Sequence, residues 1–155
     1  MTNKTLALYN KFSKLPMGKR IFSDVVARKA PYFSTISPRI VSLKAGYCEI
    51  HLKKRKIVQN HIGTVHVIAI CNLLEMAMGV MAEASIPPTL RWIPKGMEVK
   101  YPAKADSDIV GIAEIDQQAW FNGPEVPIPV KALNARNEVV VEGTIHLWVT
   151  ERKQR

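Results

Sequence analysis

Glu75 is the residue whose surroundings most directly indicate chemistry. Its neighbours at positions 73, 74 and 76–78 are Leu, Leu, Met, Ala and Met, the composition of a buried helix. A carboxylate there must be paired, protonated or functional, because an isolated buried charge is very costly. At about 100° per residue, the positions that share its face and would form a narrow ligand slot are Ile68, Cys71, Gly79 and Ala82. The alternative is a structural glutamate at the edge of a subunit interface, where it meets Lys or Arg.

The segment before this helix, residues 60–66, supplies groups of a second kind. Asn60 can donate an amide hydrogen bond, Gly63 permits a backbone shape that other residues rarely adopt, and Thr64 can cap the helix that follows. The unpaired amides at a helix start carry partial positive charge, which suits a carbonyl oxygen that becomes an oxyanion. His66 is either a helix-start histidine hydrogen-bonded to the backbone or a residue that orients a substrate. His61 could equally be a surface residue.

Several enzyme classes lack their signatures in this sequence. It contains no Gly-x-Ser-x-Gly, no phosphate-binding Gly-rich loop and no metal-type histidine pair, which disfavours serine hydrolases, P-loop enzymes and metalloenzymes. Cys48 and Cys71 lack the CxxC or Cys/His spacing that would hold zinc, and two cysteines cannot form a disulfide framework. We expect both to be small buried side chains, and we expect no metal and no cofactor.

Hydropathy patterns predict the elements that position these residues. Apolar residues at helical spacing predict a helix over residues 3–15, stopped by Pro16, and a second helix after Gly18. Alternation over residues 39–53 predicts two strands joined at Ala45-Gly46. A helix over about residues 64–85 is apolar on nearly every side, so other structure should wrap it. Further strands are predicted over residues 97–103, 109–116, 126–135 and 139–150.

This order of elements predicts an α+β fold in one domain, residues 1–155. An antiparallel sheet of about six strands would curl around one long central helix, with residues 1–37 as a helical N-terminal extension and residues 38–150 as the core. No repeat, linker or low-complexity segment divides the 155 residues. One sheet that covers one helix leaves strand edges uncovered, so we expect a homo-oligomer.

The composition limits the partners. The chain has 22 Lys and Arg against 13 Asp and Glu, a formal charge of +9, and its one dense basic run is Lys53-Lys54-Arg55-Lys56. Such a run is commonly a solvated strand end, and it could also bind the phosphates of a ligand. No aromatic residues that could stack on bases are interleaved with it, so we expect no nucleic-acid partner. The apolar tract over residues 62–84 is interrupted by polar residues, and the N-terminus lacks the apolar region of a signal peptide. We expect a cytoplasmic protein without a membrane partner.

Several of these residues resemble the motif of a known family. The residues that carry the resemblance are Asn60, Gly63, Thr64, His66 and Glu75, which lies fifteen positions after Asn60. They are similar to the Asn, the Gly-Thr-x-His-Gly-Gly and the helical Asp or Glu of phenylacetate-degradation-type acyl-CoA thioesterases, members of the hotdog-fold thioesterase superfamily. A second block, residues 99–110, resembles the third and fourth strands of those proteins. The match spans about residues 40–150, and the N-terminal extension resembles an uncharacterised hotdog branch.

The resemblance implies the hotdog fold and hydrolysis of an acyl-CoA thioester by a dimer or a dimer of dimers. Glu75 would be the general base or the nucleophile, Asn60 would come from the facing subunit, and the Val67 amide would stabilise the oxyanion. His66 would belong to the same catalytic group, and the residues that would bind substrate are His61, Gly63, Thr64 and Arg91. The nucleotide of CoA would be held by some of Lys53, Lys54, Arg55, Lys56, Arg91 and Lys95.

Two alternatives stay open. The family's Gly-Gly is Val67-Ile68 here, which keeps an amide N–H but narrows the approach to it. This substitution favours a non-catalytic acyl-CoA or acyl-carrier binding module that uses the same slot. A hotdog hydratase or dehydratase would need an acid–base pair at the cleft, which His61 or His66 could form with Glu75. CoA would enter only as part of the substrate, so no separate cofactor is implied.

Overall fold

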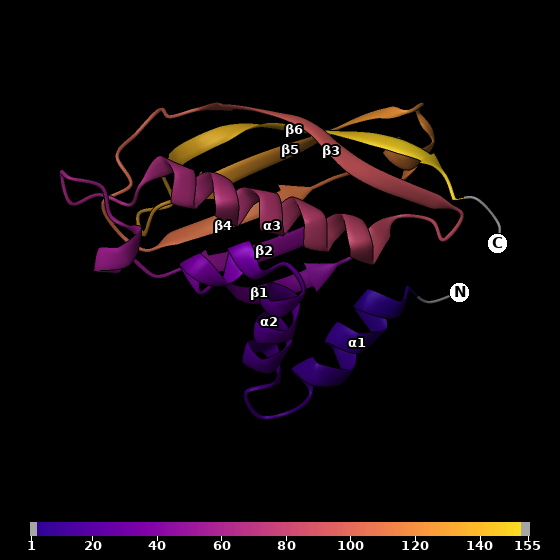
Figure 1. The fold of residues 1–155 in the computed structure, drawn as a ribbon, viewed down its shortest axis with the longest axis horizontal. Helices are drawn as coiled ribbons and strands as arrows, with labels where there is room; N and C mark the ends of the chain where they lie inside the picture. Colours follow the sequence, from indigo (N-terminus) through magenta and orange to yellow (C-terminus); the bar gives the residue numbers. More distant parts are fainter. Residues whose placement is uncertain (1–2, 153–155) are drawn as a thin grey trace.

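A six-stranded antiparallel sheet and one long helix form the centre of the molecule (Figure 1). The computed structural model describes residues 3–152. Its helices are α1 (Lys4–Ser13), α2 (Gly18–Lys29) and α3 (Val67–Ser85), with the 3-10 helices η1 (Pro31–Ile36), η2 (Lys56–Val58) and η3 (Gln117–Phe121). Its strands are β1 (Arg39–Lys44), β2 (Tyr47–Leu52), β3 (Leu90–Lys100), β4 (Ile109–Glu114), β5 (Glu125–Leu133) and β6 (Val139–Glu151), in the spatial order β1-β2-β4-β5-β6-β3. The predicted curled sheet around a central helix, with N-terminal helices, is confirmed.

β3 differs most from its prediction. It begins at Leu90 instead of residue 97, and it continues through Pro94 with an irregular register between Pro94 and Gly96. Proline and glycine usually mark the end of a strand, so Pro94 and Gly96 led to a predicted start after them and the first half of β3 was not predicted. The structure tolerates them because β3 is an edge strand, which needs a ladder of hydrogen bonds on one side only.

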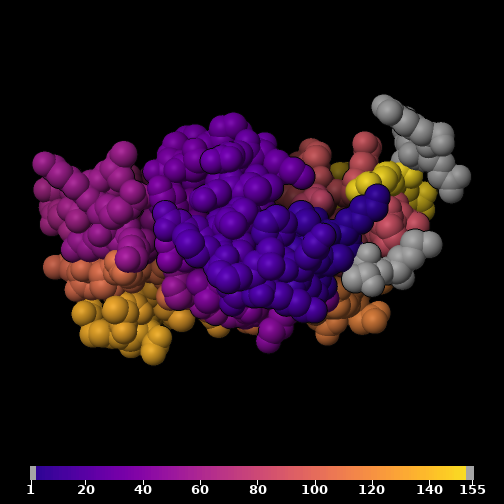
Figure 2. Space-filling model, turned by 90° about the horizontal axis from the view of Figure 1, so that it is seen from below, coloured from indigo at the N-terminus to yellow at the C-terminus, as the bar shows by residue number. Residues whose placement is uncertain are grey.

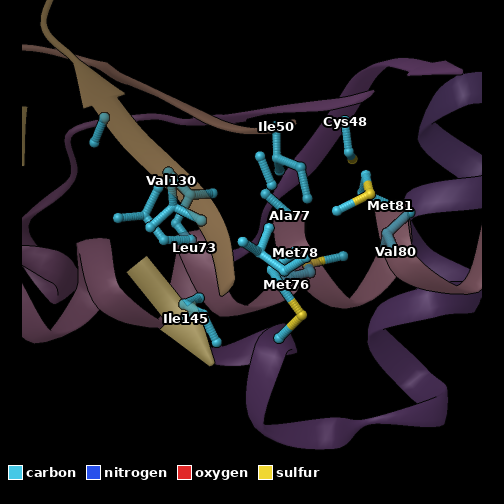
Figure 3. Close-up of a cluster of buried hydrophobic side chains, with 14 of the residues drawn as sticks. Cys48, Ile50, Leu73, Met76, Ala77, Met78, Val80, Met81, Val130 and Ile145 are labelled. Carbon is cyan, nitrogen blue, oxygen red and sulfur yellow. The ribbon is translucent and has the colours of Figure 1, made fainter. Parts of the chain in front are cut away.

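The strands place one set of side chains against α3. In β2, Cys48 and Ile50 are fully buried, while Glu49, which lies between them, points to the other face of the sheet. Figure 3 shows Leu73, Ala77 and Met81, each one turn apart on α3, pointing toward the strands. This periodic contact is the main core of the protein.

α3 and the sheet approach each other closely at Gly111 of β4. A Cβ atom at this position would lie 2.9 Å from the Cδ2 and Cγ atoms of Leu73, nearer than carbon atoms normally approach. The absent side chain therefore allows α3 to pack directly on the sheet.

The N-terminal helices pack beside β1 and reach one flank of α3, and they cover the lower face of the molecule (Figures 1 and 2). The Tyr9 hydroxyl donates to the Val41 carbonyl at 3.0 Å, and the backbone N–H of Ile40 donates to the Ser23 hydroxyl at 2.8 Å. The Asn3 amide donates to the Glu83 carbonyl at 2.7 Å, which ties the start of α1 to the last turns of α3. The prediction that other structure wraps the apolar helix is thus confirmed.

α3 is the one helix of residues 3–152 that is long and apolar enough to cross a membrane. Most of its length is enclosed by the sheet and the N-terminal helices. Its hydropathy is therefore that of a core helix.

Candidate functional site

Five of the predicted site residues line one hollow at the start of α3. The hollow has a volume of about 250 Å³, and the five residues are Asn60, His61, Thr64, His66 and Val67. Tyr101 and Lys104, from the connection between β3 and β4, also line it. Neither residue was predicted to belong to a site, although the connection itself is part of the family resemblance. A tyrosine and a lysine in a polar connection follow no helical or strand period, so their spacing does not indicate a site.

The Asn60 side chain holds its loop in shape. Its Oδ1 atom accepts hydrogen bonds from the backbone N–H groups of Ile62 (3.2 Å) and Thr64 (3.1 Å), and its Nδ2 donates to the Thr64 hydroxyl at 2.8 Å. Gly63 has a φ of 80°, the left-handed conformation that favours glycine. A primary amide has two N–H groups, so Asn60 keeps a second donor beyond the one given to Thr64.

His66, and not Thr64, is the N-cap of α3. Its Nδ1 atom accepts a hydrogen bond from the backbone N–H of Ile68 at 3.1 Å, which requires the imidazole to carry its proton on Nε2 when neutral. The prediction of Thr64 as the cap is wrong, because the Thr64 hydroxyl is engaged with Asn60. The interpretation of His66 as a helix-start histidine bonded to the backbone is confirmed. No hydrogen bond among residues 3–152 uses the Val67 N–H, which is therefore an available donor at the helix start.

Glu75 lies elsewhere, on the wall of a second cavity. This cavity has a volume of about 360 Å³ and is enclosed by α1, α2, η1, α3 and β3. The Glu75 side chain is half-buried, and within residues 3–152 its carboxylate has no ion pair and no hydrogen bond with another side chain. The structural interpretation, a glutamate paired with Lys or Arg, therefore finds no partner in the described part of the chain.

Gly79 follows Glu75 by one turn and lines the same cavity, as the predicted slot required. The indole of Trp92 lies against it: a Cβ at Gly79 would be 3.4 Å from the Trp92 ring. Two other predicted members of the slot do not line this cavity. Ala82 is fully buried, and Ile68 faces a separate surface hollow near η1. Trp92 was not predicted as a site residue, because Pro94 argued against a strand at residues 90–96 and Trp92 lies in that part of β3.

The two hollows of one chain are too far apart to act on one bond. Val67 and Glu75 are eight residues apart, which corresponds to about 12 Å along a helix. Arg91 does not line the hollow at the start of α3 either. It lies at the start of β3, where its Nε donates to the Thr150 hydroxyl at 3.0 Å. The described chain therefore brings together the loop residues but separates them from Glu75 and from Arg91.

Two residues of the basic run are engaged within the chain. The Lys54 ammonium donates to the Asp106 carbonyl at 2.9 Å, and the Arg55 guanidinium donates to the Ile36 carbonyl at 3.0 Å. Lys53 and Lys56 are exposed and have no ion pair within residues 3–152. These two are the members of the run that remain free to meet an anion.

The two thiols are unsuited to nucleophilic chemistry. Burial raises the pKa of Cys48 strongly, and the nearby Glu49 carboxylate raises it further. Burial also raises the pKa of Cys71, which is half-buried on α3. Both groups stay protonated at neutral pH, so neither supplies a thiolate.

The six-stranded sheet curled around α3 places the chain in the class of hotdog-fold proteins, a fold that thioesterase-family structures share. Within that class the chain belongs to the DUF4442 family, a domain of unknown function, whose model matches residues 18–149. A crystal structure from structural genomics is 38% identical, covers 96% of this chain and 99% of that chain, and has a TM-score of 0.84.

Two further structures share the fold at lower identity. A Pseudomonas aeruginosa protein of unknown function, described as "Probable Thioesterase", is 21% identical, with 89% of this chain and 97% of that chain covered and a TM-score of 0.76. A thioesterase-family protein from Silicibacter pomeroyi is 15% identical, with 88% and 100% covered and a TM-score of 0.69. Comparison with curated proteins gave no match.

Proposed function

We propose that this protein is a thioesterase that hydrolyses acyl-CoA esters in a homodimer or a dimer of dimers. The observation that carries the proposal is Glu75, a half-buried carboxylate without an ion-pair partner in residues 3–152, on the wall of an apolar cavity. An unpaired carboxylate in such a place is costly for stability, and catalysis explains why the chain keeps it. The thioesterase-family neighbours with the same fold support the same reaction class.

The free edge of β3 explains how the two hollows would meet. β3 pairs with β6, and its other edge has no partner strand within residues 3–152. A twofold contact would pair two such edges antiparallel, so the start of one β3 lies beside the end of the other. Trp92, near the start, lines the Glu75 cavity, whereas Tyr101, just past the end, lines the hollow at the α3 start. The dimer would therefore set Glu75 of one subunit against Asn60 and Val67 of the other.

In this arrangement Glu75 would act as general base on a water molecule. The water oxygen attacks the thioester carbonyl carbon while its proton moves to the Glu75 carboxylate, a role worth about 10²–10⁴-fold in rate. The Val67 N–H of the other subunit would donate to the developing oxyanion, and the second N–H of Asn60 would orient the water or the carbonyl. The C–S bond then breaks, and the thiolate departs with little need for acid assistance.

The nucleotide end of CoA would meet exposed cations near the hollow. Lys104 lines it, and Lys53 and Lys56 are the free members of the basic run. Phosphates attract such side chains without requiring a preformed cage. A carrier protein with acidic residues could present the acyl group to the same cations, and in either case the substrate would be cytoplasmic.

The second candidate is a binding module that retains an acyl-CoA without cleaving it. The Val67 side chain, where the family has glycine, is the observation that favours it. A turnover screen across acyl-CoA esters, with a thiol-detecting reagent for released CoA, separates the two. Release well above the uncatalysed rate with at least one ester supports the thioesterase. Binding of the esters without release of CoA from any of them would overturn it and favour the module.

A further inference from the structure

We infer that α1, α2 and α3 form a pocket for an aliphatic acyl chain of about ten carbon atoms, and that α2 limits the size of the chain that fits. This inference rests on the proposed function, because the thioester would lie at Glu75. It adds the chemical class of the acyl group and names the residues that select it.

The lining of the Glu75 cavity is mostly apolar. Its aliphatic, aromatic and thioether side chains include Leu8, Val26, Phe33, Met78, Val80 and Trp92. Two charged side chains of the lining, Lys29 and Glu83, are exposed, so they belong to its solvent-facing edge. An apolar interior with a few polar groups is typical of a ligand pocket. The ligand part that suits this interior is hydrocarbon.

The length of the cavity favours a chain over a compact ring. Glu75 and Glu83, both on its lining, are eight residues apart on α3, or about 12 Å. Carbon–carbon bonds of about 1.5 Å advance an extended chain by about 1.25 Å each, so about ten carbon atoms span that length. The volume agrees, since about 360 Å³ divided by about 30 Å³ for each water-sized group gives on the order of ten groups.

Gly79 and Trp92 close one side of the cavity. A carbon atom placed where Gly79 lacks its Cβ would touch the indole at 3.4 Å, the ordinary van der Waals distance. The ring therefore packs against the backbone of α3, and an acyl chain would run past this contact, through the part of the cavity that α1 and α2 also line.

α2 supplies part of the cavity wall. Val25 and Val26 of α2 line the cavity, whereas Ile21, one turn earlier on the same helix, is exposed and does not. α2 lies within residues 18–149, the part that matches the family model. A larger side chain at residue 26 would reduce the volume of the cavity, and the same side chain at residue 21 would leave it unchanged.

The experiment measures binding of S-alkyl-CoA thioethers, which cannot be hydrolysed, to the full-length protein by isothermal titration calorimetry. Alkyl chains of about four to fourteen carbons are compared with S-phenethyl-CoA. Burying two more methylenes should tighten binding about tenfold until the cavity is full at about ten carbons, after which the affinity should level off or fall. S-phenethyl-CoA should bind more weakly than the octyl thioether.

Val26→Trp tests the role of α2, and Ile21→Trp is its matched control. Val26→Trp should weaken binding of the decyl thioether at least about tenfold and leave the butyl thioether nearly unchanged, while Ile21→Trp should keep the wild-type series. If Val26→Trp does not fold, Gly79→Ala replaces it, because its added carbon fits beside Trp92. This variant should also weaken binding of the decyl thioether, but by less.

A wild-type affinity that does not depend on chain length would overturn the inference, and it would indicate that the partner subunit fills the cavity. An unchanged series in the folded variants at positions 26 and 79 would also overturn it. The proposed function fails separately: dependence of thioether binding on chain length, without turnover of any acyl-CoA, supports the pocket and contradicts the thioesterase. Turnover of an acyl-CoA without dependence of thioether binding on chain length would support the thioesterase and contradict the pocket.

Discussion

The indole Nε1 of Trp92 donates a hydrogen bond of 2.9 Å to the Oε1 atom of Glu83. This bond joins the edge strand β3 to the last turn of α3, two turns beyond Glu75. It holds the ring against Gly79, so the width of the cavity depends on a contact between a strand and a helix that no sequence pattern connects.

Trp92→Phe removes the donor and keeps an aromatic ring. Because the bond lies at the surface, we expect the free energy of unfolding to fall by only about 1 kcal/mol, measured by urea denaturation. Trp148→Phe, on the outer face of the sheet, is the control and should not alter acyl-CoA kinetics. A Trp92→Phe protein with unchanged stability and unchanged KM would show that the bond does not position the ring.

Glu75→Gln removes the charge and preserves the shape. If Glu75 is the general base, kcat should fall by at least about 10²-fold with KM nearly constant. The melting temperature should not fall, because no partner in residues 3–152 would lose its counter-charge. Glu142→Gln, on the exposed outer face of β6, is the matched control and should keep the wild-type kcat. Wild-type turnover in Glu75→Gln would eliminate the proposed mechanism.

Mixed dimers test whether the site is shared. Glu75→Gln and Asn60→Ala proteins should each be nearly inactive alone. After the two are unfolded together and refolded, half of the dimers should be mixed, and each mixed dimer should contain one intact site and one doubly altered site. Activity should then recover to about a quarter of wild type. No recovery, with mixed dimers verified by mass spectrometry, would place both residues in a site within one chain.

The thiols should react in a defined order. A raised pKa means that the thiol form persists, so the thiolate fraction of Cys71 should become large only as the pH rises above the ordinary value of 9.0. A thiol reagent should label Cys71 slowly at neutral pH and faster in alkaline buffer, and it should label Cys48 only after unfolding. Peptide mass spectrometry reports both, and Cys71→Ser should abolish labelling of the native protein. Rapid labelling of Cys48 at neutral pH would contradict its burial.

Gly111→Ala tests the close contact between α3 and the sheet. The new methyl group would stand 2.9 Å from Leu73, and relieving this contact should cost about 1–3 kcal/mol of unfolding free energy. Gly96→Ala is the control, because a Cβ there meets nothing within 4 Å. Equal stability of the two variants would show that α3 shifts freely on the sheet.

The sequence predicted the order of the elements because each has a clear period. The apolar residues at helical spacing in α1 and the long apolar segment of α3 each fit a helix, and the alternation of apolar and polar residues in β2 fits a strand. It predicted the loop residues of the site because Asn60, Gly63 and His66 are chemically distinctive and close together in the chain. It missed Trp92 and Tyr101, whose places depend on how β3 crosses α3 and returns to the start of the helix. That crossing is a long-range packing relationship, and no local spacing encodes it.

Three methionines stand at the middle of α3, and all are fully buried: Met76, Met78 and Met81 (Figure 3). Their unbranched thioether side chains have three rotatable bonds and adapt to irregular neighbours, unlike the β-branched residues of the strands. The protein thus combines a stiff sheet with a pliable helix wall. Met76 and Met78 line the cavity beside Glu75, so its α3 side can change shape through side-chain rotamers without a backbone rearrangement.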